Sequence, residues 1–262
     1  MKKILICLLI AFPILAGAQS DLEKLANSPR HQEWVEITYN GRTVHTFVVY
    51  PEVTEKTKVV MVIHENRGLN DWARVFADEL AEKGFIAIAP DLLSQTNDSI
   101  KKTSDFKNPD AAREALYALS MEQITADLDA TFAYAKTIAA GNGKISVVGF
   151  CWGGSQCFNY ATINPNLEEA IVFYGTAPEE KEVFKKIETP VYGFYGGNDA
   201  RVNATIEQTE LLMNSSGKTY DYKIYEGGGH GYMRSGSQPN AEEVNSNARK
   251  NSWERLLSIL KN

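Results

Sequence analysis

The stretch that decides the fold is Lys144-Ile145-Ser146-Val147-Val148-Gly149-Phe150-Cys151-Trp152-Gly153-Gly154. Its first five residues are typical of a β-strand, and a helix is expected to follow the glycines and to run to about Ile163. Two segments of different regular structure therefore meet at a short turn that is rich in glycine and holds one cysteine.

Strand-like and helix-like segments alternate on both sides of this turn, from residue 59 to the end of the chain. The further strand-like segments are 59–63, 85–89, 170–174, 191–195 and 220–225. The further helical patterns are a helix capped by Asn70 and stopped by Gly84, two pieces within 111–140, and the segments 205–213 and 242–260. Such alternation is typical of a parallel sheet with helices on both faces.

The segment before residue 59 predicts an addition to this sheet. Residues 34–39 and 43–50 are joined by Asn40-Gly41, which is the strongest short signal for a β-hairpin. We expect the hairpin to form an antiparallel edge, as mixed sheets often have. The polar, patternless segment 94–109 is expected to be a surface excursion. No linker-like stretch divides the chain, so one domain is expected.

The composition is that of an ordinary globular protein, with 262 residues, 44% apolar residues and a formal net charge of −6. A chain of this length can bury a sizeable core. The acidic balance argues against a nucleic-acid binder, because such a protein needs a basic face to displace counterions. Three cysteines are too few for a scaffold built on disulfides.

Residues 1–18 have the features of a secretory signal peptide. Lys2 and Lys3 precede a short apolar run, and Ala16-Gly17-Ala18 supplies the small residues that a signal peptidase accepts. The run is short for a membrane span, and an uncleaved anchor is the alternative. We expect an exported protein, periplasmic or secreted, that has no membrane association after cleavage. The mature domain would be residues 19–262, with a net charge of −8 because two lysines are lost.

Cleavage would leave two cysteines, Cys151 and Cys157. Six residues along a helix rise by about 9 Å, which is too far for an unstrained disulfide. Both are therefore expected to be free thiols. Since exported proteins usually pair or avoid their cysteines, a retained free thiol points to a function.

Cys151 lies in the pattern Gly149-x-Cys151-x-Gly153 between a strand and a helix, which is the position of the nucleophile in an elbow turn. Glycines avoid collisions in so tight a turn, and its strain lifts the nucleophile above the sheet. The amino end of the following helix favours a thiolate and a developing oxyanion. The alternatives are a buried structural cysteine and a phosphate-binding loop, although the Lys-Ser/Thr pair of such a loop is missing.

A carboxylate and a histidine follow two later strands. Asp199 comes after the strand 191–195, and His230 comes after the strand 220–225 and three glycines. The order nucleophile, acid, histidine is the one that this sheet architecture uses. A histidine that is held by a carboxylate can accept a proton from a thiol and return one to a leaving group. Taken singly, Asp199 is more often a turn former and His230 a surface residue.

A metal site is the alternative interpretation of this histidine. It would combine His64, Glu65 and His230, but no pair among them has the spacing of typical metal ligands. No metal and no other cofactor is therefore expected.

Four motifs resemble the dienelactone hydrolase family of α/β-hydrolases, over roughly residues 33–260. They are Ile63-His64-Glu65-Asn66-Arg67-Gly68-Leu69, Gly149-Phe150-Cys151-Trp152-Gly153-Gly154, Gly196-Gly197-Asn198-Asp199 and Gly229-His230. The resemblance implies an α/β-hydrolase fold, with a mostly parallel sheet, helices on both faces and the amino-terminal antiparallel hairpin at its edge.

The resemblance also implies a role for each matching residue. The catalytic residues would be Cys151, Asp199 and His230, and Glu65 would contact the thiol and modulate its protonation before substrate binds. The oxyanion hole would consist of two backbone N–H groups, and three side chains would bind a substrate carboxylate or line its pocket. The N–H groups are those of Asn66 and Trp152, and the substrate-binding residues are Arg113, Tyr117 and Arg234.

These roles imply a hydrolase of carboxylic esters or lactones that works through a thioester intermediate. The partner would be a small-molecule ester or lactone, carboxylated because guanidinium groups bind carboxylates. We expect a monomer that binds no nucleic acid. Two alternatives are a binding protein that has the pocket without turnover, and a thiol redox protein that uses Cys151.

Overall fold

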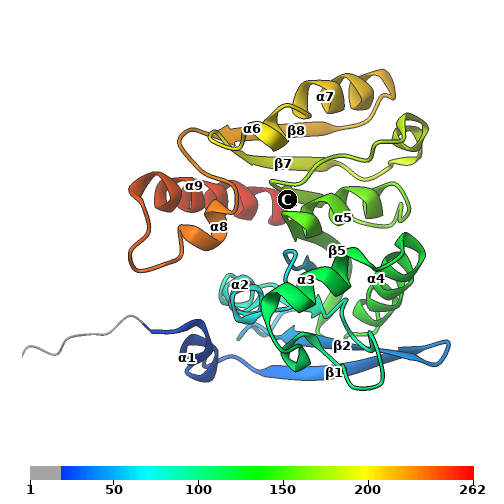
Figure 1. Cartoon of the computed structure of the whole chain (residues 1–262), viewed down its shortest axis with the longest axis vertical. Helices are drawn as coiled ribbons and strands as arrows, with labels where there is room; N and C mark the ends of the chain where they lie inside the picture. The colour runs from blue at the N-terminus through cyan, green and yellow to red at the C-terminus, as the bar shows by residue number, and fades with distance from the viewer. Residues whose placement is uncertain (1–18) are drawn as a thin grey trace, which may run out of the picture.

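The computed structural model describes residues 19–262, and the expected signal peptide lies outside them. Its strands form one sheet in the order β1-β2-β4-β3-β5-β6-β7-β8 (Figure 1). They are β1 (Gln32–Tyr39), β2 (Arg42–Val49), β3 (Thr57–Ile63), β4 (Ile86–Pro90), β5 (Gly141–Phe150), β6 (Ala170–Phe173), β7 (Val191–Gly196) and β8 (Tyr220–Tyr225). Strands β3 to β8 are parallel, while β2 is antiparallel to both β1 and β4. The mostly parallel sheet and its antiparallel hairpin edge are confirmed.

Helices cover both faces of the sheet, as expected (Figure 1). One face carries α1 (Asp21–Ala26), α2 (Asp71–Glu82) and α9 (Glu243–Leu260), which share an apolar core with β3 and β4. The other face carries α4 (Met121–Ala135), α5 (Trp152–Ala161), the 3₁₀ helix η2 (Lys181–Lys186) and α7 (Ile206–Ser215). Within the described chain, each helix is too short or too polar to span a membrane.

Local sequence explains where the elements begin and end. Both residues of the hairpin turn have positive φ, 46° at Asn40 and 80° at Gly41, which is the geometry that Asn-Gly favours. The side chain of Asn70 accepts a hydrogen bond from the Ala73 N–H and so caps α2. Gly84 follows this helix with a φ of 95°, where a side chain would be strained.

Several elements differ from the prediction. The segment 111–140 does form two helices, but they are α3 (Pro109–Tyr117) and α4, and the second ends at Ala135. The short helices α6 (Ala200–Asn203) and α8 (Tyr232–Ser235), the 3₁₀ helix η1 (Thr103–Asp105), and α1 and η2 were not expected. They are one or two turns long, so each is too short to show the periodicity on which the prediction rests.

The excursion 94–109 is mostly exposed, but one residue ties it to the sheet. Thr103 donates two hydrogen bonds to the buried Asp91 carboxylate, from its backbone N–H at 2.6 Å and from its hydroxyl at 2.7 Å. The same hydroxyl oxygen accepts from the Leu69 N–H at 3.0 Å. Burial raises the pKa of Asp91 to about 6. Thr103 thus connects the end of β4, the loop after β3 and the segment that leads into α3.

Candidate active site

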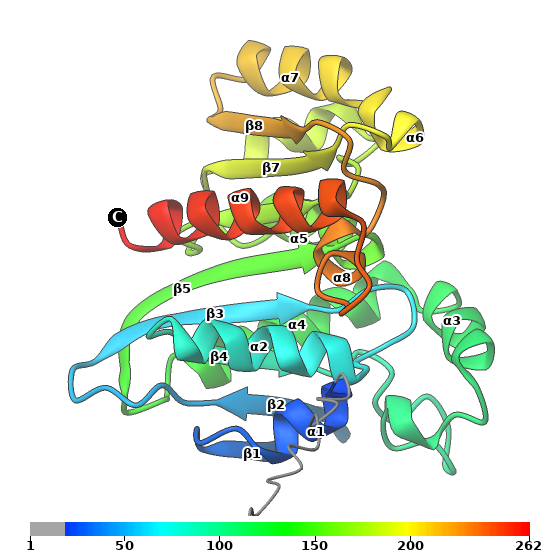
Figure 2. The same ribbon diagram turned by 90° about the vertical axis from the view of Figure 1, so that its left-hand side faces the viewer.

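Four residues with reactive side chains follow the carboxyl ends of parallel strands. Glu65 follows β3, Cys151 follows β5, Asp199 follows β7 and His230 follows β8. The arrowheads of these strands point to the same side in Figure 2, where α3, α6 and α8 also lie. This edge is where ligand sites of open α/β sheets form, because loops from several strands meet there.

The turn at Cys151 is strained and closely packed. Cys151 has a φ of 55° and a ψ of −116°, which is a rare conformation for a residue with a side chain. A Cβ atom on Gly149 would lie 2.0 Å from the Gly153 carbonyl oxygen, and one on Gly153 would lie 2.3 Å from the His64 carbonyl oxygen. The Cys151 N–H donates to the Phe173 carbonyl at 3.0 Å. The glycines therefore allow α5 to start directly against β3 and β5.

The three residues of the expected triad lie in hydrogen-bonding contact. His230 Nε2 is 3.0 Å from Cys151 Sγ, and His230 Nδ1 is 2.5 Å from Asp199 Oδ2. Asp199 is buried, and its other carboxylate oxygen caps α6 by accepting from the Val202 N–H. The carboxylate therefore orients the imidazole, whose second nitrogen faces the thiol.

Charge at this triad favours a protonated imidazole. The pKa of His230 is raised to about 9, mainly by its hydrogen bond with Cys151, while burial opposes the shift and Asp199 adds to it. The other described cysteine, Cys157, is fully buried and donates to the Ile171 carbonyl. Burial raises the pKa of Cys157, so it has little thiolate character. Both thiols are free, as predicted.

Two backbone amides near the thiol are available as donors. Asn66 and Trp152 line a pocket together with Cys151, and their N–H groups donate to no acceptor within residues 19–262. The neighbouring His64 is fully buried, with Nδ1 at 2.8 Å from the Glu65 carbonyl and Nε2 accepting from the Leu92 N–H. Burial lowers the pKa of His64 to about 4, so its ring is a neutral structural group. Among the described residues, no cluster of three or more His, Cys, Asp or Glu side chains is arranged to hold a metal.

Glu65 contacts different partners from the one that the resemblance implies. Its carboxylate accepts a hydrogen bond from Arg234 Nε at 2.8 Å and one from the Tyr174 hydroxyl at 3.4 Å. In the described residues the hydrogen-bonding partner of the Cys151 thiol is His230, and Glu65 makes no hydrogen bond to the thiol. The reason is electrostatic, because Glu65 is almost buried and lies beside a guanidinium that neutralises it.

Arg234 is therefore only partly free to bind a substrate. Its Nε is committed to Glu65, while its side chain remains 51% exposed. It lines a pocket of about 330 Å³ together with Cys151, His230 and Arg113.

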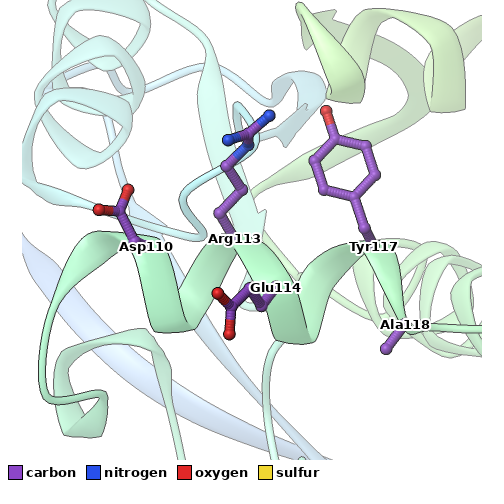
Figure 3. A pocket seen from close by; sticks show the side chains of 5 residues that line it. All are labelled: Asp110, Arg113, Glu114, Tyr117 and Ala118. Carbon is purple, nitrogen blue, oxygen red and sulfur yellow. The ribbon is translucent and has the colours of Figure 1, made fainter.

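Arg113 and Tyr117 lie where the resemblance implies. They project from the same side of α3, whereas Glu114 points the other way (Figure 3). The Arg113 guanidinium lies 5.6 Å from the centre of the Tyr117 ring. Both residues line a second pocket beside the thiol, of about 350 Å³. The hollow of about 660 Å³ in Figure 3 is lined only by residues 110–118 and does not include Cys151.

The structure adds residues that sequence reasoning missed. Tyr174 ends the β6 region with a φ of 39°, packs edge-on against His230 with ring centres 5.1 Å apart, and is buried. Ser155, Thr176 and Arg201 line the pocket on the Trp152 side. A signal was available for Tyr174 and Arg201, since each follows or ends a strand of the parallel set, where side chains of such a sheet meet.

This sheet order, with an elbow cysteine after its central strand β5, defines an α/β-hydrolase fold. Residues 44–262 match the sequence profile of the dienelactone hydrolase family, and the chain belongs to that family. The assignment confirms the expected fold and the expected class of enzyme, a carboxylic-ester hydrolase.

Three similar proteins match this chain over nearly their whole length. A protein of Saccharolobus solfataricus with the provisional name carboxymethylenebutenolidase is 29% identical over 258 residues, which cover 86% of this chain and 97% of that protein. The structure of a provisional dienelactone hydrolase from Klebsiella pneumoniae has a TM-score of 0.77 and 23% identity, covering 88% of this chain and 98% of its own. A dienelactone hydrolase-like promiscuous phosphotriesterase from metagenomic libraries has a TM-score of 0.74 and 20% identity, with the same coverage. The two structural likenesses establish the fold.

Proposed function

We propose that the protein hydrolyses esters or lactones of carboxylated small molecules through a thioester on Cys151. The observation that carries this proposal is the continuous contact from Asp199 through His230 to Cys151, with distances of 2.5 and 3.0 Å. The raised pKa of His230 keeps the imidazole protonated beside the thiol, where it can give a proton to a leaving group.

The reaction then has two steps. In the first, the Cys151 sulfur bonds to the substrate carbonyl carbon, the bond to the leaving oxygen breaks, and His230 gives that oxygen a proton. In the second, water attacks the thioester while His230 accepts a proton from it, and the sulfur leaves. The free N–H groups of Asn66 and Trp152 would stabilise the oxyanion in both steps.

The arginines beside the thiol predict a negatively charged substrate. Arg113 and Arg234 line the pockets beside the thiol, although the chain as a whole is acidic. A guanidinium binds a carboxylate through two parallel hydrogen bonds. Arg113, with Tyr117 next to it, has no carboxylate partner among the described residues, and a substrate carboxylate would compete with Glu65 for Arg234.

The thiol redox alternative is less well supported. A redox cycle through a disulfide needs a resolving cysteine that can reach Cys151. Cys157 is fully buried, and its thiol donates a hydrogen bond to the Ile171 carbonyl. The second alternative is a binding protein without turnover, and product formation in the experiment below distinguishes it from the hydrolase.

The test compares Cys151→Ala with Cys157→Ala on a panel of aryl esters and carboxylated lactones. Cys157→Ala is the matched control because it removes the other thiol at a site away from the pockets. We expect Cys157→Ala to retain activity and Cys151→Ala to lose at least about a thousandfold in kcat/KM. Mass spectrometry of the quenched wild type should show an acyl group on the peptide that contains Cys151. Equal rates in the two variants would exclude the mechanism, and binding without product would favour the binding protein.

We also propose that residues 1–18 direct export and are removed before Gln19, and that the mature enzyme is a monomer. The basic start, the short apolar run and the small residues before Gln19 support the first part. Amino-terminal sequencing of the protein from a cell envelope fraction, together with its mass in light scattering, tests both parts. An intact amino terminus in the cytoplasmic fraction would contradict export.

A further inference from the structure

A group of polar side chains on the Trp152 side of the pocket is not used by the mechanism above. Ser155 is the fourth residue of α5, and Thr176 follows β6. Arg201 lies on α6, two residues after Asp199. All three line the pocket of about 350 Å³ that also contains Cys151 and His230.

The hydroxyl groups of Ser155 and Thr176 together have one O–H donor that is not used between them. The Ser155 hydroxyl oxygen accepts from the Thr176 N–H at 2.9 Å and lies 3.1 Å from the Thr176 hydroxyl oxygen. Whichever hydroxyl donates in this pair, the hydrogen of the other has no acceptor among the described residues. The pair therefore presents a hydrogen-bond donor to the pocket.

Arg201 adds an uncompensated charge to the same place. Its guanidinium makes no ion pair or hydrogen bond within residues 19–262, and this pocket is lined by two arginines and by no aspartate or glutamate. A spare hydroxyl donor and a guanidinium without a partner together suit an anionic group.

The two pockets meet at the thiol. The pocket with Arg201 and the pocket with Arg234 share Cys151, His230 and Arg113. A carbonyl positioned over the thiol therefore borders both pockets, one with Arg201 and the other with Arg234. We propose that the substrate is a dianion, with one anionic group on each side of the reacting carbonyl, and that Arg201 with Ser155 and Thr176 binds the second group. This inference rests on the proposed hydrolytic function and specifies its substrate class.

The experiment measures kcat/KM for four aryl esters of different charge. They are 4-nitrophenyl acetate, which is neutral, the monoanions mono-4-nitrophenyl succinate and 4-acetoxybenzoate, and the dianion mono-4-carboxyphenyl succinate. The variants are Arg201→Gln, Arg201→Lys and, as a charge-matched control outside the pockets, Lys181→Gln in the exposed part of η2.

We expect the wild type and Lys181→Gln to prefer the dianion to 4-acetoxybenzoate, which has the same leaving group, by roughly tenfold to a hundredfold more than they prefer mono-4-nitrophenyl succinate to 4-nitrophenyl acetate, which is the range for a charge-assisted pair. Arg201→Gln should lower kcat/KM for the dianion at least about tenfold more than it lowers kcat/KM for the neutral ester, and Arg201→Lys should restore part of the preference. The same preference in Arg201→Gln as in the wild type would overturn the proposal.

A second readout separates this inference from the proposed function. Glutarate should protect Cys151 from alkylation by iodoacetamide better than butyrate does, and Arg201→Gln should abolish the difference. If the neutral ester is hydrolysed in a Cys151-dependent way but neither assay depends on Arg201, the dianion proposal fails while the hydrolase stands. If no ester is hydrolysed but glutarate protects through Arg201, the hydrolase fails while the anion subsite stands.

Discussion

Replacing Asp199 by asparagine tests whether its charge is needed at the active site. Asparagine has the same shape, and the side-chain oxygen that caps α6 through the Val202 N–H can be retained. The change therefore acts on the 2.5 Å contact with His230 Nδ1. Losing one charge-assisted hydrogen bond costs about 1.5 to 3 kcal/mol, which corresponds to roughly tenfold to 150-fold in rate.

A further loss comes from the imidazole itself. An asparagine amide can hold His230 in the tautomer whose Nε2 carries the proton, and this nitrogen then cannot accept one from Cys151. We therefore expect kcat/KM for an aryl ester to fall by about a hundredfold to ten-thousandfold in D199N. The pKa of His230, which Asp199 helps to raise, should fall as well. It can be followed by NMR titration of the ring.

The matched control for D199N is Asp221→Asn. The Asp221 carboxylate is 65% exposed and pairs with Arg255 at the sheet edge, so it contributes at most about 1 kcal/mol and lies outside the pockets. Asp221→Asn should unfold in urea with a free energy close to that of the wild type, and D199N should lose no more than about 3 kcal/mol. If D199N folds normally and keeps more than about a third of the activity, the buried carboxylate has no part in the reaction and the triad is refuted.

Three further predictions concern the glycines of the elbow turn, the pH dependence of stability and the hydrogen bonds of Thr103. Gly149→Ala places a methyl group 2.0 Å from a backbone oxygen, so urea unfolding should show a loss of at least about 2 kcal/mol. Gly229→Ala is the control, because its nearest atom is a side-chain oxygen at 3.7 Å, and it should lose less than about 1 kcal/mol. Similar stabilities of the two variants would contradict the packing argument. The raised pKa of His230 stabilises the folded state fully below its ordinary value of 6.5, and this contribution is lost as the pH rises to about 9. This contribution of His230 to the free energy of unfolding is at most about 3 kcal/mol. Solvent screening of a ring that is 35% exposed reduces it to the order of 1 kcal/mol. Unfolding free energies at pH 6 and pH 9.5 should therefore fall more in the wild type than in Cys151→Ala, and parallel curves would show that the thiol does not raise this pKa. Thr103→Val removes the hydroxyl that donates to Asp91 and accepts from the Leu69 N–H, so it should cost about 1 to 3 kcal/mol in thermal unfolding. It should also lower kcat more than it raises KM. Unchanged activity would show that Thr103 does not position the loop that holds Asn66.

Much of the fold follows from patterns that are local in the chain. Continuous apolar runs became the buried strands β3 and β4, and Asn40-Gly41 became the turn of the hairpin, because each pattern acts through its own neighbours. The elements that escaped prediction, α1, α6 and α8, are short. Their ends are set by caps and by packing, which periodicity does not report.

The sequence by itself determined the position of each reactive group along the chain. An alternation of strands and helices implies a parallel sheet, and parallel strands bring their carboxyl ends to one edge. This is why Cys151, Asp199 and His230, far apart in the chain, could be expected at one site.

Only the tertiary structure decided which of these groups touch. Glu65 was expected against the thiol but pairs with Arg234 and Tyr174, and His230 alone contacts the sulfur by a hydrogen bond within residues 19–262. Arg201 was not singled out from the sequence, and it is the structure that places it in the pocket, on α6. The physical reason is that hydrophobic periodicity constrains the backbone, whereas the partner of a buried charge depends on side-chain directions and on loops that come together only in the folded chain.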